Sequence, residues 1–511
     1  MRSRGAAGPA MTAPEPLLGE LARWAAGLRF EDLPRRVTDL AKSQLVSQLA
    51  AIRAGLAHPL GGKLVRAFGG PLQPDPARAA CVLAGLGSWL NLDDTAYAGH
   101  LSNSTVAVPL AYARERRADG RTLLAAVVAA NECAARVTAA ATLGPFRGQT
   151  AAHTSLVGGV AGRLHGTGAA AREWVRALGL ALTMPPWTLM HGFLGGEARV
   201  LSAYTPVRMA MDACDAAGAG VTSAPDVLEH PQGFLARFAA VPLPEAVTTG
   251  LGSRWHTDTL SFKVRPGGPG VDSAVDCALE IRRRLAGAAE SAADSVCPED
   301  VTEVIVETSF YTMHAERLAR AHDDGPRTPA SVLPLSVPYA VATALVEGDL
   351  TVADFTSPAT DDSRRWRLAK RVRLVEDPLM TRDLWHSEAP FGEALRQAAE
   401  RGPGWLQAFA GPERAALLGC PAEPAADFRY ATKHTGARVT VRLADGRSFC
   451  TRRDIPLGAA GPDTRARHRD LVREKFLATG GKDEIAEGFE TLEEAGPGRV
   501  AELVEAALGD R

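Results

Sequence analysis

The chain has 511 residues, with 57 Lys and Arg against 59 Asp and Glu, so its formal net charge is −2. Proteins that bind nucleic acids usually carry a strong basic excess, and this balance argues against that class. Apolar residues make up 46% and charged residues 23%, the composition of a globular protein with a large core. The length predicts two or more domains.

The seven cysteines are scattered and none forms a Cys-x-x-Cys pair. This arrangement disfavours a disulfide scaffold, a zinc ribbon and an iron–sulfur cluster, and it fits a reducing cytoplasm. No apolar run approaches the roughly 18–20 residues of a membrane helix. Residues 1–16 contain three prolines and no apolar stretch, so we expect a disordered extension there. We therefore expect a cytoplasmic protein without a metal, a nucleic-acid partner or a membrane partner.

The first half of the chain, residues 17–262, has the periodicity of helices. Apolar residues recur at helical spacing over residues 17–28 and 37–56, and the Ala-rich stretches 122–141 and 169–182 show no strand alternation. Gly158 and Gly162 are four residues apart, which favours close approach of neighbouring helices. This part is predicted to be a compact helical bundle.

The pattern changes at residue 263. The sequence Lys-Val-Arg-Pro-Gly-Gly-Pro-Gly over residues 263–270 cannot continue a helix. Alternating residues predict strands near 304–308, 372–374 and 439–443, the last of which runs into an Asp445-Gly446 hairpin turn. Helical patterns lie between them at 271–285 and 337–346, so residues 263–456 are predicted to form an α+β domain.

The helical pattern returns after Pro456, over residues 463–478 and 498–508. We expect residues 457–511 to fold back onto the first helical part. The predicted fold is therefore mainly α with an α+β part.

Common nucleotide and hydrolase motifs are missing. Residues 158–162 are glycine-rich but do not follow a predicted strand, so they do not make a dinucleotide-binding loop. The sequence contains no Walker A motif, no Gly-x-Ser-x-Gly and no His-Glu-x-x-His. The chemistry must come from another pattern.

That pattern is Asn91-Leu92-Asp93-Asp94-Thr95 followed by His100, directly after a predicted helix over residues 80–90. Taken alone, it could be an acidic helix cap. It resembles the Asp-x-Asp-Asp-Thr…His motif of the MmgE/PrpD family, which includes 2-methylcitrate dehydratase, cis-aconitate decarboxylase and iminodisuccinate epimerase. Further segments resemble the family in the same order over roughly residues 17–508: His153-Thr154 with Gly158-Gly159, Leu228-Glu229 with Gly233-Phe234, Leu335 to Ala342, and Asp445-Gly446-Arg447.

The resemblance implies an architecture and a type of activity. A large helical domain would form from residues 17–262 and 457–511, with residues 263–456 as an inserted α+β lid. Members are usually homodimers that need neither a metal nor an organic cofactor. Their substrates are small carboxylates, from which a hydrogen next to a carboxylate, or a carboxylate itself, is removed.

The resemblance also implies roles for individual residues. His100 and His153 would be the acid and base, and Asp94 and Thr95 would orient or hydrogen-bond the reacting groups. Lys263 would neutralise a substrate carboxylate from the domain junction. The predicted substrate-binding set is Asn91, Asp93, Arg199, Lys263, Arg265 and Asp272.

Three positions depart from the family pattern. Asn91 replaces the first Asp of the motif, Arg199 replaces a pocket Lys, and Asp272 replaces a His of the lid. Arginine binds carboxylates bidentately but cannot act as a base at neutral pH. Asp272 would repel a carboxylate or pair with Arg199 or Arg265. These changes predict a less anionic substrate than methylcitrate or cis-aconitate, or one that carries an amine.

Three functions remain open on the sequence. The first is a lyase that dehydrates or decarboxylates a small carboxylic acid. The second is an isomerase or epimerase that uses the same proton-transfer site. The third is a catalytically inactive helical scaffold or binding protein, which the three departures motivate.

Overall fold

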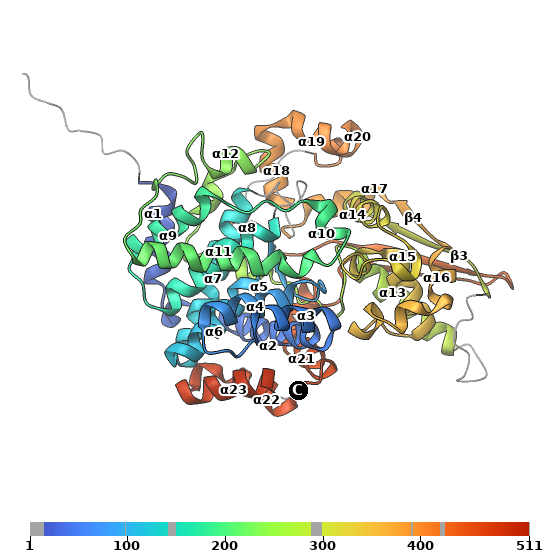
Figure 1. The fold of residues 1–511 in the computed structure, drawn as a ribbon. Coiled ribbons are helices and arrows are strands. Elements are labelled where there is room, and N and C mark those ends of the chain that lie inside the picture. The colour runs from blue at the N-terminus through green and yellow to red at the C-terminus, as the bar shows by residue number, and fades with distance from the viewer. Residues whose placement is uncertain are drawn as a thin grey trace, which may run out of the picture.

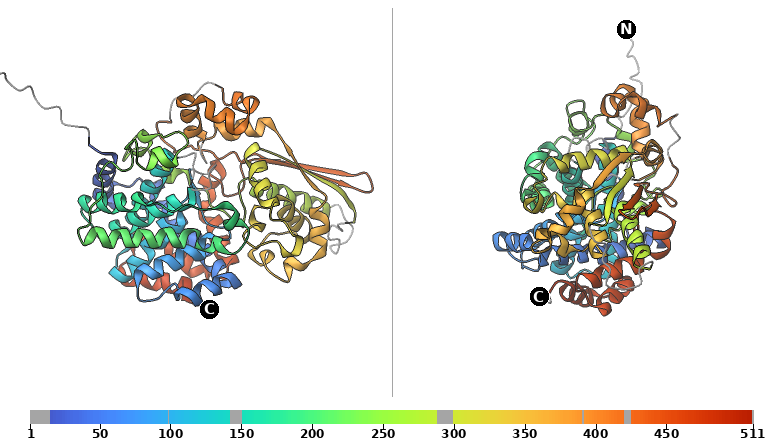
Figure 2. Two further views of the ribbon diagram at one scale, coloured as in Figure 1. Left: turned by 45° about the horizontal axis from the view of Figure 1, so that its top comes forward. Right: turned by 90° about the vertical axis from the view of Figure 1, so that its right-hand side faces the viewer.

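The computed structural model describes residues 15–97, 99–141, 150–287, 299–389, 392–419 and 425–509. A large body of packed helices lies beside a smaller part that contains a sheet (Figures 1 and 2). The expected fold class, mainly α with an α+β part, is confirmed. Almost all of the expected disordered extension lies outside the described residues, as do Cys297 and Cys420.

The helical body begins with helices that match the apolar periodicity of the sequence. α2 is buried along most of its length, and the side chain of Asp75 caps the N-terminus of α4. The helices before residue 263 are α1 (Leu17–Gly27), α2 (Arg35–Ala57), α3 (Pro59–Phe68), α4 (Pro76–Ser88), α5 (Ser102–Thr105), α6 (Ala107–Arg116), α7 (Gly120–Ala140), α8 (Thr150–Gly166), α9 (Ala171–Thr183), α10 (Met190–Leu194), α11 (Leu201–Gly218) and α12 (Phe234–Phe238).

Close packing of α8 depends on its glycines. A Cβ atom at Gly158 would lie 2.3 Å from Ser104 Oγ, and one at Gly162 would lie 2.8 Å from Pro109 Cδ. Any larger residue would push α8 away from α5 and α6. The close approach expected from the spacing of these two glycines is therefore found.

α7 is the one described helix long and apolar enough to cross a membrane by length and composition. We expected no such segment in the sequence, and this one was missed because Arg121, Glu132 and Arg136 interrupt it. Its apolar window is entirely buried inside the protein, as in the core helix of a folded domain.

The sheet has the strand order β4-β3-β5-β6. β3 pairs in parallel with β4 and antiparallel with β5, which forms the expected hairpin with β6. Alternate residues of β3 and β5, including Val304, Val306, Val439 and Val441, are buried. The strands are β3 (Val301–Thr308), β4 (Val372–Glu376), β5 (Ala437–Leu443) and β6 (Ser448–Arg453).

Helices pack against this sheet: α13 contacts β5 and β6, and α15 contacts β4. The helices of this part are α13 (Val271–Gly287), α14 (Phe310–Arg320), α15 (Val337–Glu347) and α16 (Ser363–Ala369).

A second group of helices follows β4 and was not predicted. These helices are α17 (Pro378–His386), α18 (Gly392–Arg401), α19 (Pro403–Ala410) and α20 (Pro412–Ala416). They share a small core of their own that includes Leu384, Trp385, Leu395 and Leu406. The sequence pattern hid them because each is short and begins at a proline or glycine.

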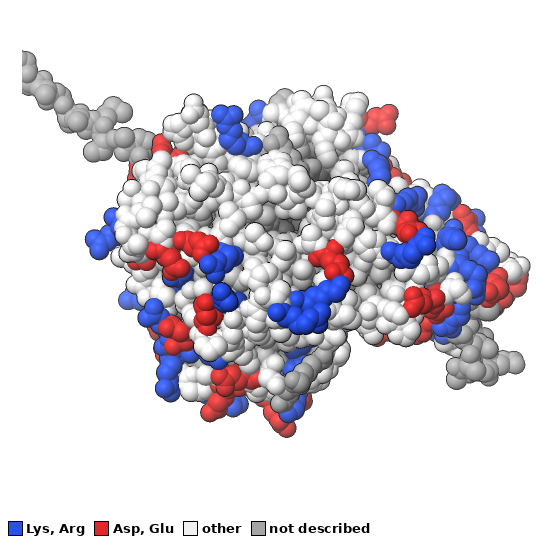
Figure 3. All heavy atoms as spheres, viewed as in Figure 1, with Lys and Arg blue, Asp and Glu red and all other residues white. Residues whose placement is uncertain are grey.

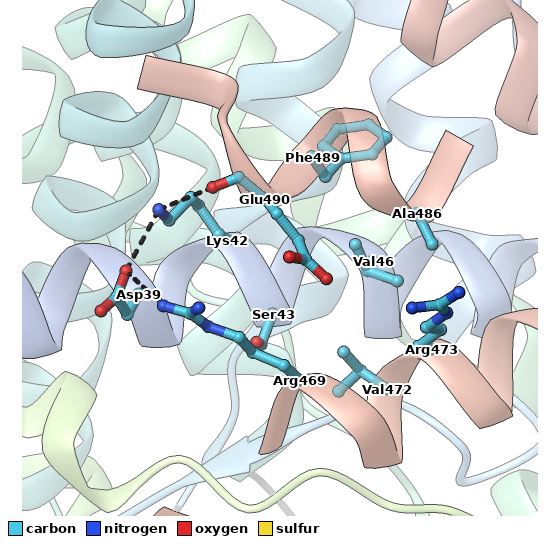
Figure 4. A pocket seen from close by; sticks show the side chains of 10 residues that line it. All are labelled: Asp39, Lys42, Ser43, Val46, Arg469, Val472, Arg473, Ala486, Phe489 and Glu490. Carbon is cyan, nitrogen blue, oxygen red and sulfur yellow. Dashed lines mark hydrogen bonds and ion pairs between the residues drawn. The ribbon is translucent and has the colours of Figure 1, made fainter. Parts of the chain in front are cut away.

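The last helices return to the helical body and pack against α2 (Figure 1). They are α21 (Pro462–Ala478), α22 (Asp483–Glu490) and α23 (Pro497–Gly509). Figure 4 shows the charged contacts that hold α21 and α22 on α2. Asp39 lies 3.1 Å from both Lys42 and Arg469, and Lys42 donates a 2.9 Å hydrogen bond to the carbonyl of Glu490. These contacts fix the position of α21, which carries Lys475 into the interior.

Candidate active site

The loop between α4 and α5 carries most of the predicted motif. It contains two short antiparallel strands, β1 (Thr95–Ala96) and β2 (Gly99–His100), in which Thr95 is paired with His100. A bridge from Thr95 to Ser261 joins the loop to the segment that leads into Lys263. The loop therefore lies where the helical body meets the sheet-containing part.

Asn91 begins this loop with a backbone φ of 54°, in the left-handed region. Asparagine tolerates that conformation better than most residues other than glycine. Its side-chain oxygen accepts a hydrogen bond from Arg199, which lies in the 3-10 turn Ala198–Val200. Because Asn91 is a neutral amide, it holds Arg199 in place without cancelling its charge.

Asp93 and His100 form a carboxylate–imidazole pair. His100 Nδ1 lies 2.7 Å from Asp93 Oδ2, which also accepts a 2.8 Å hydrogen bond from Asn103. Burial acts to raise the pKa of Asp93, but the charges of His100, Lys263 and Arg199 outweigh it and hold the pKa below its usual range. With Nδ1–H donated to the carboxylate, Nε2 keeps its lone pair, and no described residue is bonded to Nε2. His100 is therefore oriented to accept a proton.

Asp94, the next residue, is hydrogen-bonded to two helices, α2 and α5. It accepts hydrogen bonds of 2.6 Å from Ser47 and 3.2 Å from Ser102. Lys475 Nζ is 3.7 Å from Asp94 and donates 2.7 Å hydrogen bonds to Ser47 Oγ and to the carbonyl of Leu92. Burial raises the pKa of Asp94 to about 6 despite the opposing charge of Lys475. These contacts make Asp94 an anchor of the loop.

Two cations, Lys263 and Arg199, act on the carboxylate of Asp93. Lys263 is buried, and its ammonium has no hydrogen-bond partner among the residues described. Burial lowers its pKa, while the charges of Asp93 and Asp272 act in the opposite direction. Burial also lowers the pKa of Arg199, to about 10, so Arg199 stays charged at neutral pH. Lys263 is available to bind an anion near Asp93, whereas Arg199, whose guanidinium donates to Asn91 and to the carbonyl of Ser331, adds a fixed positive charge.

Asp272 is the second residue of α13, and the charges that act on it most strongly are those of Lys263 and Lys433. This differs from the expectation that Asp272 pairs with Arg199 or Arg265. Arg265 instead makes ion pairs with Asp276 at 3.1 Å and Asp349 at 3.5 Å. It lines a neighbouring cavity of about 710 Å³, which lies between the helical body and the sheet-containing part. Arg265 is thus not brought into direct contact with the Asp93–His100 pair.

His153, the second predicted acid or base, is oriented differently from His100. Its ring packs edge-on against Phe234 and Phe238, and Nε2 lies 3.2 Å from the carbonyl oxygen of Pro186. Burial lowers its pKa to about 4. The neighbouring Thr154 lies against Gly99, so the two histidines come from adjacent elements, but the described contacts of the His153 ring are with these aromatic residues.

The buried neutral His153 predicts acid sensitivity of the fold. Its pKa is lower in the folded state than in the unfolded state, so its stabilising contribution is full above pH 6.5 and is lost as the pH falls toward 4. The loss amounts to about 3 kcal/mol. Asp94, with a raised pKa, acts in the opposite direction over part of this range. Chemical unfolding from pH 7.5 to 4.5 should therefore show a smaller acid-induced loss in His153→Gln than in the unsubstituted protein. Parallel curves would contradict the neutral buried state.

Two site residues escaped the sequence analysis, Lys433 and Lys475. Lys433, in the segment before β5, donates a 3.2 Å hydrogen bond to Thr95 Oγ1. Lys475 reaches Asp94 from α21. Neither lies in a recognisable motif, and each is more than 300 residues from its partner in the chain. Only the folded chain brings them to the loop.

The charges inside the site differ from those outside. On the face in Figure 3, basic and acidic side chains are intermingled, with no large area of one sign. Inside, the cations Arg199, Lys263, Lys433 and Lys475 face the carboxylates Asp93, Asp94 and Asp272. These seven side chains have an excess of one positive charge, which favours binding of an anion. No group of three or more His, Cys, Asp and Glu side chains in the described ranges could hold a metal ion.

The fold and this site define a helical protein with an inserted α+β part and a buried site between the two. Comparison with protein families shows which class this is. The MmgE/PrpD N-terminal domain matches residues 19–245, and the MmgE/PrpD C-terminal domain matches residues 269–399. The chain belongs to the MmgE/PrpD family, whose members are largely enzymes and include dehydratases. A comparison with curated proteins gave no match.

Proposed function

We propose that the protein is a lyase that dehydrates or decarboxylates a small carboxylic acid without a cofactor. The observation that carries the proposal is the Asp93–His100 pair, in which no described residue binds Nε2, beside the buried cations Lys263 and Arg199. A base next to fixed positive charges suits removal of a proton adjacent to a carboxylate, because the negative charge that develops is stabilised where it forms.

The dehydration would proceed by proton transfer followed by loss of water. The substrate carboxylate binds to Lys263, and His100 Nε2 takes the proton from the adjacent carbon. The electron pair of that C–H bond forms the new C=C bond as the C–O bond on the next carbon breaks. The leaving hydroxide takes the proton from protonated His100 and departs as water. In decarboxylation, the C–C bond to a carboxylate breaks instead, carbon dioxide leaves, and the electron pair left on carbon takes a proton from His100, which solvent has protonated beforehand. Asp93 orients the imidazole throughout and stabilises its protonated form.

The proposed substrate is less anionic than a tricarboxylate. The site has an excess of only one positive charge because Asp272 offsets one lysine. A second carboxylate close to Asp272 would be repelled, whereas a hydroxyl or amino group could donate to it. The substrate class that fits is a hydroxy or amino acid with one carboxylate at this end.

A panel of 3-hydroxy acids, their 2-hydroxy isomers, amino acids, and hydroxylated di- and tricarboxylates tests the proposal. A lyase gives a new alkene absorbance together with loss of water or carbon dioxide by mass spectrometry. Deuterium uptake from D₂O without net loss of mass would instead assign an isomerase or epimerase. If no acid in the panel is changed or exchanged, the chain acts as a scaffold or binding protein and the enzymatic proposal fails.

A further inference from the structure

Lys433 reaches the site from a part of the chain that the family motifs do not include. Its backbone is fixed by a 2.9 Å hydrogen bond from its N–H to the carbonyl of Ala460 and by a bridge to Ala389. The side chain is 6% exposed, and its ammonium donates to Thr95 Oγ1 at 3.2 Å. This is the one hydrogen bond that the described residues give the ammonium group, so at least one of its N–H donors remains available.

The hydrogen bond from Lys433 also determines what Thr95 can do. Because Thr95 Oγ1 accepts from Lys433, its own proton is free to be donated elsewhere. No described side chain accepts that proton, and Thr95 is the strand partner of His100. The Thr95 hydroxyl and the Lys433 ammonium are therefore two adjacent donors beside the proton-accepting imidazole.

The charges around Asp272 indicate why Lys433 is needed, in addition to Lys263, to bind a carboxylate. The charges that act most strongly on Asp272 are those of Lys263 and Lys433, and Arg265 acts on it more weakly. Lys263 with Asp272 is a neutral pair, which gives little attraction for a carboxylate. With Lys433 included, the three side chains Lys263, Lys433 and Asp272 have a net charge of +1. Burial and the charge of Lys263 lower the pKa of Lys433 to about 8, and an anion between the two lysines would relieve that repulsion.

We propose that Lys433 is a substrate-binding residue which, together with Lys263, binds one substrate carboxylate, and that Asp272 limits this subsite to a single negative charge. The subsite would also accept a hydroxyl or amino group next to that carboxylate through Asp272. This inference rests on the proposed function, because it assigns the carboxylate-binding part of the same site.

Binding of simple probes tests the subsite without requiring turnover. Calorimetric titration of the full chain with glycolate and with malonate at pH 7 compares one carboxylate with two. Lys433→Gln should weaken binding of both probes by about tenfold or more, and Lys433→Arg should retain most of the affinity. Asp272→Asn should strengthen malonate binding by about tenfold and glycolate binding less. Lys370→Gln, at an exposed lysine after α16, is the matched control and should bind both probes as the unsubstituted protein does.

The double variant Lys433→Gln/Asp272→Asn provides the sharpest comparison because it keeps the net charge of the unsubstituted subsite. Its malonate affinity should return to within about threefold of the unsubstituted protein. Equal losses in the single and double variants, or no loss in Lys433→Gln, would overturn the inference. If the probes bind as expected but no acid is turned over, the subsite stands and the lyase proposal fails. If an acid is turned over with unchanged KM in Lys433→Gln, the subsite fails and the lyase proposal stands.

Discussion

Replacing His100 with alanine should reduce kcat by at least a hundredfold on any acid that the protein converts. The substitution removes the base, and general acid–base groups typically contribute factors of 10² to 10⁴. The cost in stability should be smaller than for a fully buried pair, because the side chain of His100 is 31% exposed and Asp93 keeps its hydrogen bond from Asn103. Steady-state kinetics together with chemical unfolding separates the two effects. His386→Ala, at an exposed histidine in α17, serves as the control with unchanged kinetics.

Asp93→Asn adds a second comparison for the same pair. An amide keeps the shape of the side chain but no longer stabilises protonated His100. We expect a large loss in kcat with a small change in KM, together with a lower pKa in the acidic limb of the pH–rate profile. Full activity in His100→Ala would remove His100 from the mechanism and point to another base, and full activity in Asp93→Asn would remove the orienting role of Asp93.

Replacing Lys475 with methionine should destabilise the protein by about 3–5 kcal/mol, the usual cost of leaving one partner of a buried ion pair uncompensated. Lys475 and Asp94 are both fully buried, and the ammonium also satisfies Ser47 and the carbonyl of Leu92. The free energy of unfolding, measured by denaturant titration at pH 7.5, should show the loss. The exposed Lys370→Met change provides a control that should leave it unaltered.

The double variant Lys475→Met/Asp94→Asn distinguishes the lost charge from lost packing. With Asp94 neutral, no carboxylate is left unpaired, and a substantial part of the stability should return. A double variant no more stable than Lys475→Met would show that the hydrogen bonds to Ser47 and Leu92, rather than the ion pair, hold the loop.

The sequence predicted those parts of the fold that depend on local patterns. The expected strands at 304–308, 372–374 and 439–443 lie within β3, β4 and β5, because alternating side chains reflect one buried face. The helix predicted over residues 122–141 corresponds to α7. α17 to α20 were missed because helices of five to ten residues, separated by prolines and glycines, leave too few turns for a periodic pattern.

The sequence indicated the site residues that lie within one short motif. It did not indicate those that come from distant segments of the chain. The motif from Asn91 to His100 contained both members of the carboxylate–imidazole pair, which are seven residues apart, but the resemblance assigned the orienting role to Asp94 rather than to Asp93. Lys433 and Lys475 were not found, because a buried lysine in a polar segment looks like a surface lysine until its partner is known. The orientation of His153 was equally hidden, because it depends on Phe234 and Phe238 in another helix.

The position of Lys475 near the end of the chain affects how the protein folds during synthesis. The loop that carries Asp94 leaves the ribosome almost 400 residues before the lysine that compensates its charge. During synthesis, the first helices can collapse, but their central carboxylate has no buried cation until α21 emerges. The ion pair can therefore form only after the segment with the sheet has been translated, and we expect a nascent chain stalled before α21 to be recognised by chaperones and proteases.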